Sequence, residues 1–258
     1  MPQSIVITGA SSGIGAALAC EYSGPGVLLA LTGRDTSRLA AVAETCRKKH
    51  ADVMAEPIDV TEGAAMAQFL ERAHARRPLD LVIANAGIGA GRGETIEQVR
   101  RIFAINVDGV VNTVVPAIEK MLTKAPDAAG RRGQIAIMSS LAGFHGFPGA
   151  PAYCASKAAV KVWGESLRSE LHGRGIRVSV ICPGFVRSRM SERNKFRMPL
   201  LMDADRAARI IRRGLSRNRA RIAFPRRIYG PVALISALPA SWLDPLFRRV
   251  TKKFAKSL

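Results

Sequence analysis

The chain has 258 residues, of which 48% are hydrophobic and 5% aromatic, a composition that suits one large α/β core of small aliphatic side chains. Its four cysteines form no C-x-x-C pair and have no histidine at metal-ligand spacing, so we expect no disulfide framework, no metal site and a reducing, cytoplasmic location. The formal net charge of +19 belongs mainly to the C-terminal quarter, because residues 187–258 hold 19 Lys and Arg against four acids.

Short apolar segments alternate with helical patterns along most of the chain. The predicted strands are 4–8, 27–32, 52–58, 79–84, 134–139, 176–181 and 221–224, and helical spacing is clearest at 36–50, 152–171 and 203–218. Near-continuous apolar strands separated by helices indicate a parallel sheet covered on both faces. Because crossovers between parallel strands are right-handed, we predict a doubly wound α/β sheet of about seven strands, of the Rossmann type. This domain would span residues 1–225, followed by an extension at 226–258, and the opening MPQSIVITG predicts no secretory signal.

The first predicted strand leads directly into the glycine-rich run TGASSGIG, residues 8–15. Glycines in such a run let the backbone approach a pyrophosphate that lies on the N-terminus of the following helix. Gly9, Gly13 and Gly15 would serve the turn, the close approach and the helix packing. A plain strand–helix turn is the alternative, but the Ala-rich helical pattern that follows favours a dinucleotide site.

The end of the second predicted strand bears on which dinucleotide binds. An NAD site would want an acid there for the ribose 2′-hydroxyl, but the sequence LTGRD has Gly33 in that place and Arg34 next to it. A guanidinium beside the ribose favours a 2′-phosphate through paired, charge-assisted hydrogen bonds. We therefore predict NADP(H), with NAD(H) as the alternative, and interpret Asp35 as the cap of a helix that begins at Thr36.

Residues 153–157, YCASK, place a tyrosine and a lysine one helical turn apart. Alone, such a pair is common on surface helices and says little. It occurs here with TGASSGIG, with NAG at 85–87, with Ser140 and with PGFV at 183–186, in the order found in the short-chain dehydrogenase/reductase family. The chain resembles that family over roughly residues 3–190, and the motifs are jointly specific.

The resemblance implies an oxidoreductase that interconverts a carbonyl and a secondary alcohol. Tyr153 would be the general acid/base and Lys157 its activator, which also bonds the nicotinamide ribose; Ser140 would bind the substrate oxygen, and Asn106 would hold a water that links Lys157 to solvent. In reduction, hydride would pass from the nicotinamide to the carbonyl carbon while Tyr153 gives its proton to oxygen. A free phenol has a pKa of about 10. We expect Lys157 and the positive nicotinamide ring to lower the pKa of Tyr153.

The resemblance also assigns contacts to the cofactor. Asp59 would contact the adenine, with a helix cap before Thr61 as the alternative, and Ser188 stands where the family usually has Thr. Ser139 should point to the face of the sheet opposite Ser140. The predicted cofactor-binding residues are Gly9, Ser11, Ser12, Gly13, Ile14, Gly15, Arg34, Asp59, Val60, Asn85, Ala86, Gly87, Tyr153, Lys157, Pro183, Gly184, Val186 and Ser188.

The segment 187–218 lies where members of the family place a lid over the substrate. Its apolar residues Met190, Phe196, Met198, Leu200, Leu201 and Met202 favour a hydrophobic or lipid-like ketone or alcohol, with a sugar or polyketide-like substrate as the alternative. A second hypothesis is a non-enzymatic cofactor sensor or scaffold on the same fold. The complete set of four catalytic residues favours the enzyme, because a sensor has no need of the tyrosine.

The extension 226–258 is basic and apolar. Its uncharged stretch 228–243 is too short for a membrane span and is interrupted by Pro231 and Pro239. Apolar anchors flanked by arginine and lysine, with Trp242 and Phe247 at the interface, fit a segment that lies on an anionic membrane on the cytoplasmic face. Packing as a subunit interface or pocket lid is the alternative, and without a nucleic-acid module we predict no nucleic-acid binding. The resemblance further implies a homodimer formed through the helices that carry Asn106 and Tyr153.

Overall fold

The computed structural model describes residues 2–89, 94–192, 198–239, 241–243 and 245. Within these residues, seven parallel strands form one sheet in the order β3-β2-β1-β4-β5-β6-β7. The strands are β1 (Ser4–Thr8), β2 (Leu28–Thr32), β3 (Asp52–Glu56), β4 (Leu81–Ala84), β5 (Gly133–Met138), β6 (Ile176–Pro183) and β7 (Arg221–Phe224). The order reverses between β1 and β4, which confirms the predicted doubly wound, Rossmann-type sheet. Ligands of such sheets bind outside the carboxyl ends of the strands at that reversal.

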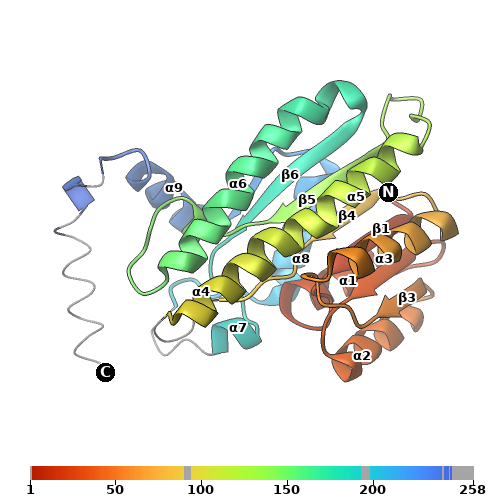
Figure 1. Cartoon of the computed structure of the whole chain (residues 1–258), viewed down its shortest axis with the longest axis horizontal. Helices are drawn as coiled ribbons and strands as arrows, with labels where there is room; N and C mark the ends of the chain where they lie inside the picture. Colours follow the sequence, from red (N-terminus) through yellow and green to blue (C-terminus); the bar gives the residue numbers. More distant parts are fainter. Residues whose placement is uncertain (1, 90–93, 193–197, 240, 244, 246–258) are drawn as a thin grey trace.

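Helices cover both faces of the sheet. They are α1 (Gly13–Tyr22), α2 (Thr36–Arg47), α3 (Gly63–Arg76), α4 (Ile96–Phe103), α5 (Gly109–Thr123), α6 (Pro151–Leu171), α7 (Arg189–Glu192), α8 (Ala204–Ser216) and α9 (Arg226–Ile235) (Figure 1). A π-helical segment, Ala104–Asp108, joins α4 to α5, and short 3₁₀ turns lie at Leu141–Gly143 and His172–Arg174.

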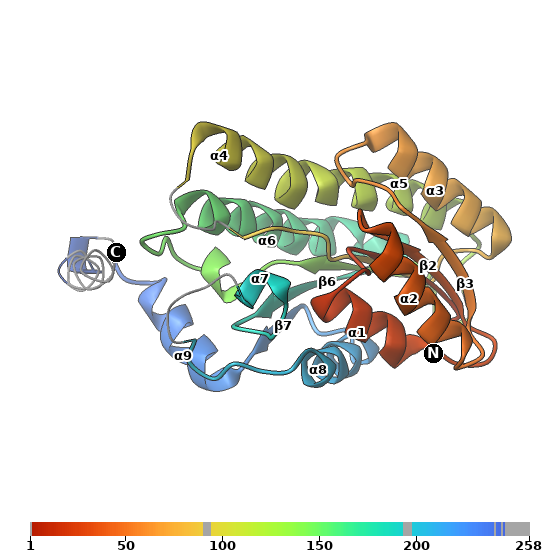
Figure 2. The same cartoon turned by 90° about the horizontal axis from the view of Figure 1, so that it is seen from below.

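Alternation along the central strand explains the two layers of helices. Ile5 and Ile7 of β1 pack with α1, α2 and α8, whereas Val6 between them packs on the other face with α3, α5 and α6. Figure 2 shows α3, α5 and α6 on one side of the sheet and α1 and α8 on the other. Both apolar layers are fully buried, so the sheet is a rigid support for the loops at its carboxyl edge.

Most predicted elements form, with shifted ends. The strand predicted at 52–58 ends at Glu56, because Pro57 has no N–H to give to the sheet. The predicted cap of α2 is confirmed: the Asp35 side chain accepts a hydrogen bond from the backbone N–H of Arg38 at 3.0 Å.

The predicted lid range 187–218 contains two different structures. Its second part is α8, whose Ala207, Ile211 and Leu215 are buried against α1 and the sheet, so α8 belongs to the core. Only the part before it, which includes α7, is placed to cover a substrate. The predicted lid residue Phe196 lies outside the described residues.

The continuous helical stretch Ile96–Thr123 is long and apolar enough to cross a membrane by length and composition. Its buried face packs on α3 and β4, and Asn106 lies in the middle of it. We therefore interpret its apolar character as packing within the domain.

Candidate active site

The glycine run after β1 folds as a tight loop onto the N-terminus of α1. Gly9 and Gly13 have φ angles of +65° and +56°, which side chains rarely adopt. A Cβ at Gly15 would lie 2.2 Å from the Gly9 carbonyl oxygen, so this position also requires glycine. The first turn of α1 contains no acid, and the Ser12 hydroxyl makes no capping hydrogen bond. The first N–H groups of α1 and their positive dipole end are therefore available to an anion.

Two side chains tie this loop to the loop after β4. The Thr8 hydroxyl accepts hydrogen bonds from the backbone N–H groups of Asn85 and Ala86, at 3.0 and 3.1 Å. In return, the Asn85 amide donates to the carbonyl of Thr8 at 2.9 Å and to that of Gly9 at 3.3 Å. Asn85 was predicted only as a cofactor contact, and its amide here fixes the geometry of the glycine loop.

Gly33 and Arg34 follow β2, and Asp59 lies in the loop after β3. We call these three residues the Arg34 group. The guanidinium of Arg34 lies 3.7 Å from the Asp59 carboxylate, and both side chains keep substantial contact with water. Asp59 also accepts hydrogen bonds from the N–H and hydroxyl of Thr61. It is not a helix cap, because α3 begins only at Gly63. A Cβ at Gly33 would lie 3.0 Å from the Ser11 hydroxyl oxygen, so an acid in this place would press on the glycine loop.

Val60, a predicted cofactor contact, points into the core. Its side chain is 5% exposed and packs so closely on α5 that a Cβ at Gly109 would lie 2.4 Å from it. The Asn112 amide occupies its carbonyl oxygen at 3.0 Å. The side chain of Val60 therefore cannot touch a bound cofactor, and only its N–H remains for that role.

Two adjacent serines follow β5, and their side chains point in different directions, as predicted from strand alternation. The Ser139 hydroxyl donates to the backbone carbonyl of Lys157 at 2.7 Å and so fastens α6 to the sheet. The Ser140 hydroxyl accepts from the N–H of Ala142 at 3.1 Å and faces the Pro183 carbonyl at 3.4 Å, at the end of β6. Ser140 is thus the serine that is presented at the carboxyl edge of the sheet.

Tyr153 and Lys157 lie one turn apart on α6, beside Ser140. The Lys157 ammonium is 6.0 Å from the centre of the Tyr153 ring and donates to the carbonyl of Met138 at 3.0 Å. Lys157 is 3% exposed, and burial lowers the pKa of its ammonium to about 8. Lys157 therefore remains mostly protonated at neutral pH, but it holds its proton less strongly than a free lysine does.

The predicted lowering of the pKa of Tyr153 includes the positive ring of the bound cofactor, and Lys157 alone does not produce it. Burial raises the pKa of the phenol, and a hydrogen bond with the Ser140 side chain opposes this only in part. Lys157 does not contribute to the shift, and its ammonium bonds to the Met138 carbonyl instead. Without a further positive charge nearby, Tyr153 is a proton donor and not a phenolate.

Asn106 lies in the π-helical segment and is fully buried. Its amide oxygen accepts from the Ile88 N–H at 2.8 Å, and its amide nitrogen donates to the Ile88 carbonyl at 3.0 Å and the Ser156 hydroxyl at 3.1 Å. The extra residue of a π turn re-aims side chains, and such turns are frequent at functional sites. Here it directs Asn106 at the loop after β4, where a Cβ at Gly87 would lie 3.1 Å from the Asn106 amide oxygen and 3.2 Å from the Lys157 ammonium. We call Asn106, Ser140, Tyr153 and Lys157 the Tyr153 group.

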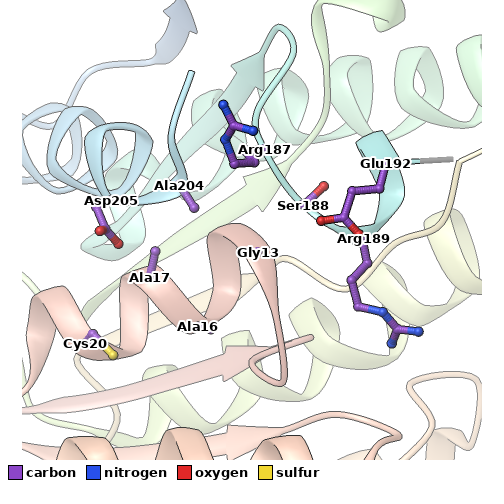
Figure 3. A pocket seen from close by; sticks show the side chains of 10 residues that line it. All are labelled: Gly13, Ala16, Ala17, Cys20, Arg187, Ser188, Arg189, Glu192, Ala204 and Asp205. Carbon is purple, nitrogen blue, oxygen red and sulfur yellow. The ribbon is translucent and has the colours of Figure 1, made fainter. Parts of the chain in front are cut away.

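The chain after β6 passes over the glycine loop. The Gly184 N–H bonds to the carbonyl of Phe224, and Val186 is buried and pairs with Met202. A Cβ at Gly13 would lie 3.0 Å from the Ser188 side chain, so this segment touches the start of α1. The Ser188 hydroxyl accepts from the N–H of Ser191 and caps α7. Figure 3 shows the cavity between these two segments.

Comparison with known proteins agrees with this geometry. Residues 3–197 match the family described as short chain dehydrogenase. An uncharacterized oxidoreductase of Myxococcus xanthus is 35% identical over 249 residues, which cover 95% of this chain and 96% of that one. The chain belongs to the short-chain dehydrogenase family.

Two solved structures extend the agreement. A short chain dehydrogenase/reductase from Burkholderia phymatum in complex with NAD has a TM-score of 0.78 and 25% identity, covering 88% of this chain and 90% of that one. A short-chain dehydrogenase from Sphingobium yanoikuyae in complex with NADPH has a TM-score of 0.76 and 25% identity, covering 98% and 95%. This short-chain dehydrogenase is therefore an NAD(P)-dependent oxidoreductase.

The residues at the carboxyl edge fit a nicotinamide dinucleotide. The glycine loop has no side chain at Gly13 and Gly15, beside the start of α1, and Arg34 and Lys157 supply positive charge. Sequence reasoning on this short-chain dehydrogenase missed Thr8 and Ser156, which hold Asn85 and Asn106. Both lie inside the quoted motifs TGASSGIG and YCASK, so the signal was present, but their partners are distant in sequence.

Proposed function

We propose that the chain interconverts a carbonyl and a secondary alcohol with NADP(H), and that Tyr153 is its general acid/base. The observation that carries the proposal is the Tyr153 group, in which a phenol, an ammonium, a hydroxyl and an amide meet where β5 and β6 end. The bound nicotinamide supplies or accepts the hydride. Ser140 holds the substrate oxygen beside Tyr153, and its hydroxyl stabilises the charge that develops there.

Lys157 and Asn106 act on the proton. In the reducing direction Tyr153 gives its proton to the substrate oxygen, which suits a phenol whose pKa is raised by burial. Lys157, whose ammonium pKa is about 8, limits the negative charge left on the phenolate and returns a proton to it. Asn106 keeps the Gly87 backbone close to Lys157 through its two hydrogen bonds with Ile88.

The preference for NADP(H) rests on Arg34. Its side chain is 47% exposed and pairs with Asp59 across 3.7 Å, an arrangement that leaves most of its hydrogen-bonding capacity to a 2′-phosphate. Gly33 occupies the place after β2 where an NAD site would have an acid. Equal affinity of the wild type for NADPH and NADH would contradict this part of the proposal.

The substrate class follows from the segment between β6 and α8. Met190 and Leu200 are exposed there, which supports a hydrophobic or lipid-like ketone or alcohol, with a sugar or polyketide-like compound as the alternative. Turnover of aliphatic, steroid-like and sugar ketones, followed by the loss of NADPH absorbance, tests this. A preference for sugars would reverse the substrate assignment.

A cofactor sensor or scaffold is the competing function. Such a protein would bind NADPH with the same residues but would not need the proton path of the Tyr153 group. It would be favoured if the protein binds NADPH but turns over no carbonyl in the panel, and if Tyr153→Phe does not change the affinity for NADPH.

The extension 226–258 supports a second proposal, contact with an anionic membrane. Leu234 and Trp242 are 68% and 72% exposed, and residues 226–258 hold seven Lys and Arg against one acid. Flotation with phosphatidylglycerol vesicles should carry the wild type but not the double variant Leu234→Ser/Trp242→Ser. Ile96→Ser, at an apolar residue equally exposed on α4, is the control. If the wild type does not float with the vesicles, the extension does not bind an anionic membrane, and packing as a subunit interface or pocket lid is its interpretation.

A homodimer is proposed through the helices of the Tyr153 group. Val111 and Val115 on α5 and Val162 on α6 are exposed apolar side chains on the outer surface of those helices. Light scattering should give twice the chain mass for the wild type and the single mass for Val111→Glu/Val162→Glu. A monomeric wild type would refute it.

A further inference from the structure

The helix that carries Tyr153, α6, begins without a cap of its own. Its N-cap residue is Ala150, which has no polar side chain, and Pro151 follows at the start of the helix. The first turn contains no acid, and the Cys154 N–H bonds to the Ala150 carbonyl at 2.9 Å. The N–H groups that precede Cys154 in this turn therefore need partners from outside the helix.

Glu94, in the loop between β4 and α4, supplies an acid to this turn. Its carboxylate oxygen Oε2 accepts a hydrogen bond from the Ala152 N–H at 2.9 Å, across 58 residues of sequence. Among the residues that the structure describes, the other oxygen, Oε1, is buried and has no hydrogen-bond partner. Figures 1 and 2 show α4 beside the start of α6, and the carboxylate thus lies at the positive end of the α6 dipole.

The first two turns of α6 are held by different parts of the chain. In the second turn, the Lys157 carbonyl accepts from the Ser139 hydroxyl at 2.7 Å, which ties this turn to the end of β5. In the first turn, Glu94 ties the backbone of Ala152 to the loop before α4. Tyr153 is the next residue, so the place of its phenol depends on this turn. Helix ends fray where their N–H groups lack partners, and Glu94 opposes that fraying.

We propose that Glu94 is a positioning residue of the reaction, which holds the first turn of α6 so that the Tyr153 hydroxyl stays beside Ser140. The inference rests on the proposed role of Tyr153 as the general acid/base. A displacement of about 1 Å at a reacting group can lower the rate about 10²-fold. A turn that has lost its cap is displaced for part of the time, so removal of Glu94 should lower turnover about tenfold.

Steady-state reduction of the best ketone tests this with three variants of Glu94. Glu94→Ala should lower kcat about tenfold, and so should Glu94→Asp, which keeps the charge but is one methylene too short. Glu94→Gln should recover most of the turnover, because its amide oxygen still accepts from the Ala152 N–H. The affinity for NADPH should stay near that of the wild type and reports that each variant is folded. Glu97→Ala, at an exposed acid in the first turn of α4, is the matched control and should turn over normally.

A double-mutant cycle separates positioning from a general loss of stability. If Glu94 acts through Tyr153, Glu94→Ala should change the residual turnover of Tyr153→Phe no further, because the phenol is already absent. A further loss of the same size in that protein would mean that Glu94 only supports the fold, and would overturn the inference. Wild-type kcat in Glu94→Ala, or a Glu94→Gln protein as slow as Glu94→Ala, would overturn it as well. Full turnover by Tyr153→Phe would instead remove the proposed function on which the inference rests.

Discussion

The Tyr153 group and the Arg34 group of the candidate site lie in different environments, the first buried and the second exposed to water. In the Tyr153 group, Asn106 and Lys157 are buried, and hydrogen bonds with backbone groups hold Asn106, Ser140 and Lys157. In the Arg34 group, the single ion pair spans 3.7 Å, and its side chains are 47% and 33% exposed. A buried group changes proton affinities strongly, whereas an exposed pair is screened by water and salt. We therefore expect changes in the Tyr153 group to act on rate and pH dependence, and changes in the Arg34 group to act on cofactor choice.

The largest effect should come from Tyr153→Phe. Loss of a positioned general acid reduces turnover by about 10²–10⁴-fold. Steady-state reduction of the best ketone measures it, with NADPH affinity expected to stay within a few-fold. Tyr229→Phe, which removes a phenol oxygen that accepts a hydrogen bond from Arg221 at 3.2 Å, should turn over normally. Full turnover by Tyr153→Phe would remove Tyr153 from the mechanism.

A second effect concerns stability and pH in the Tyr153 group. The pKa of Lys157 falls from 10.5 to about 8 on folding, so the unfolded chain binds this proton more tightly. The free energy of unfolding should therefore gain up to about 3 kcal/mol as the pH rises from about 8 to 10.5. Urea unfolding across this window measures the gain. It should be absent in Lys157→Met and present in Lys48→Met, and a Lys157→Met protein with the same pH dependence as the wild type would contradict the buried ammonium.

The glycine loop between the two groups should tolerate no side chain at Gly15. An added Cβ would lie 2.2 Å from the Gly9 carbonyl, and overpacking of this kind costs about 1–3 kcal/mol. Gly15→Ala should unfold at lower urea concentration and bind both NADPH and NADH more weakly. Gly24→Ala, where nothing lies within 4 Å of the new Cβ, is the control. Equal behaviour of the two variants would mean that the loop is not closely packed.

The smallest effect on stability belongs to Arg34→Ala. An exposed ion pair contributes about 0–1 kcal/mol, so unfolding should hardly change. Its NADPH affinity should nevertheless fall about tenfold, and the wild-type preference for NADPH should weaken as salt is added. A preference for NADPH that is independent of salt would contradict a charge-based choice.

The sequence predicted the sheet and the relative placement of Ser140, Tyr153 and Lys157 because both depend on local patterns. Alternation separates Ser139 from Ser140, and one helical turn separates Tyr153 from Lys157. It did not predict the π-helical turn at Asn106, whose bonds reach Ile88 and Ser156 across 18 and 50 residues.

Tertiary burial explains the other failures. The sign of the pKa shift at Tyr153 depends on how much water reaches the hydroxyl, which no motif records. Packing on Gly109 turns the Val60 side chain inward, so the predicted cofactor contact of Val60 is left to its backbone N–H. The assignment of α8 to a lid failed for the same reason, because its apolar face is core.

The central claim is that a positive cofactor ring turns a phenol with a raised pKa into one that can exchange protons. The chain has three tyrosines, and burial raises the pKa of Tyr22 as well as that of Tyr153, so ultraviolet titration of phenolate can isolate Tyr153 by difference from Tyr153→Phe. With NADP⁺ bound, the pKa of Tyr153 should fall well below its value in the free protein, and NADPH should not reproduce the fall. The same pKa with and without NADP⁺ would contradict the account.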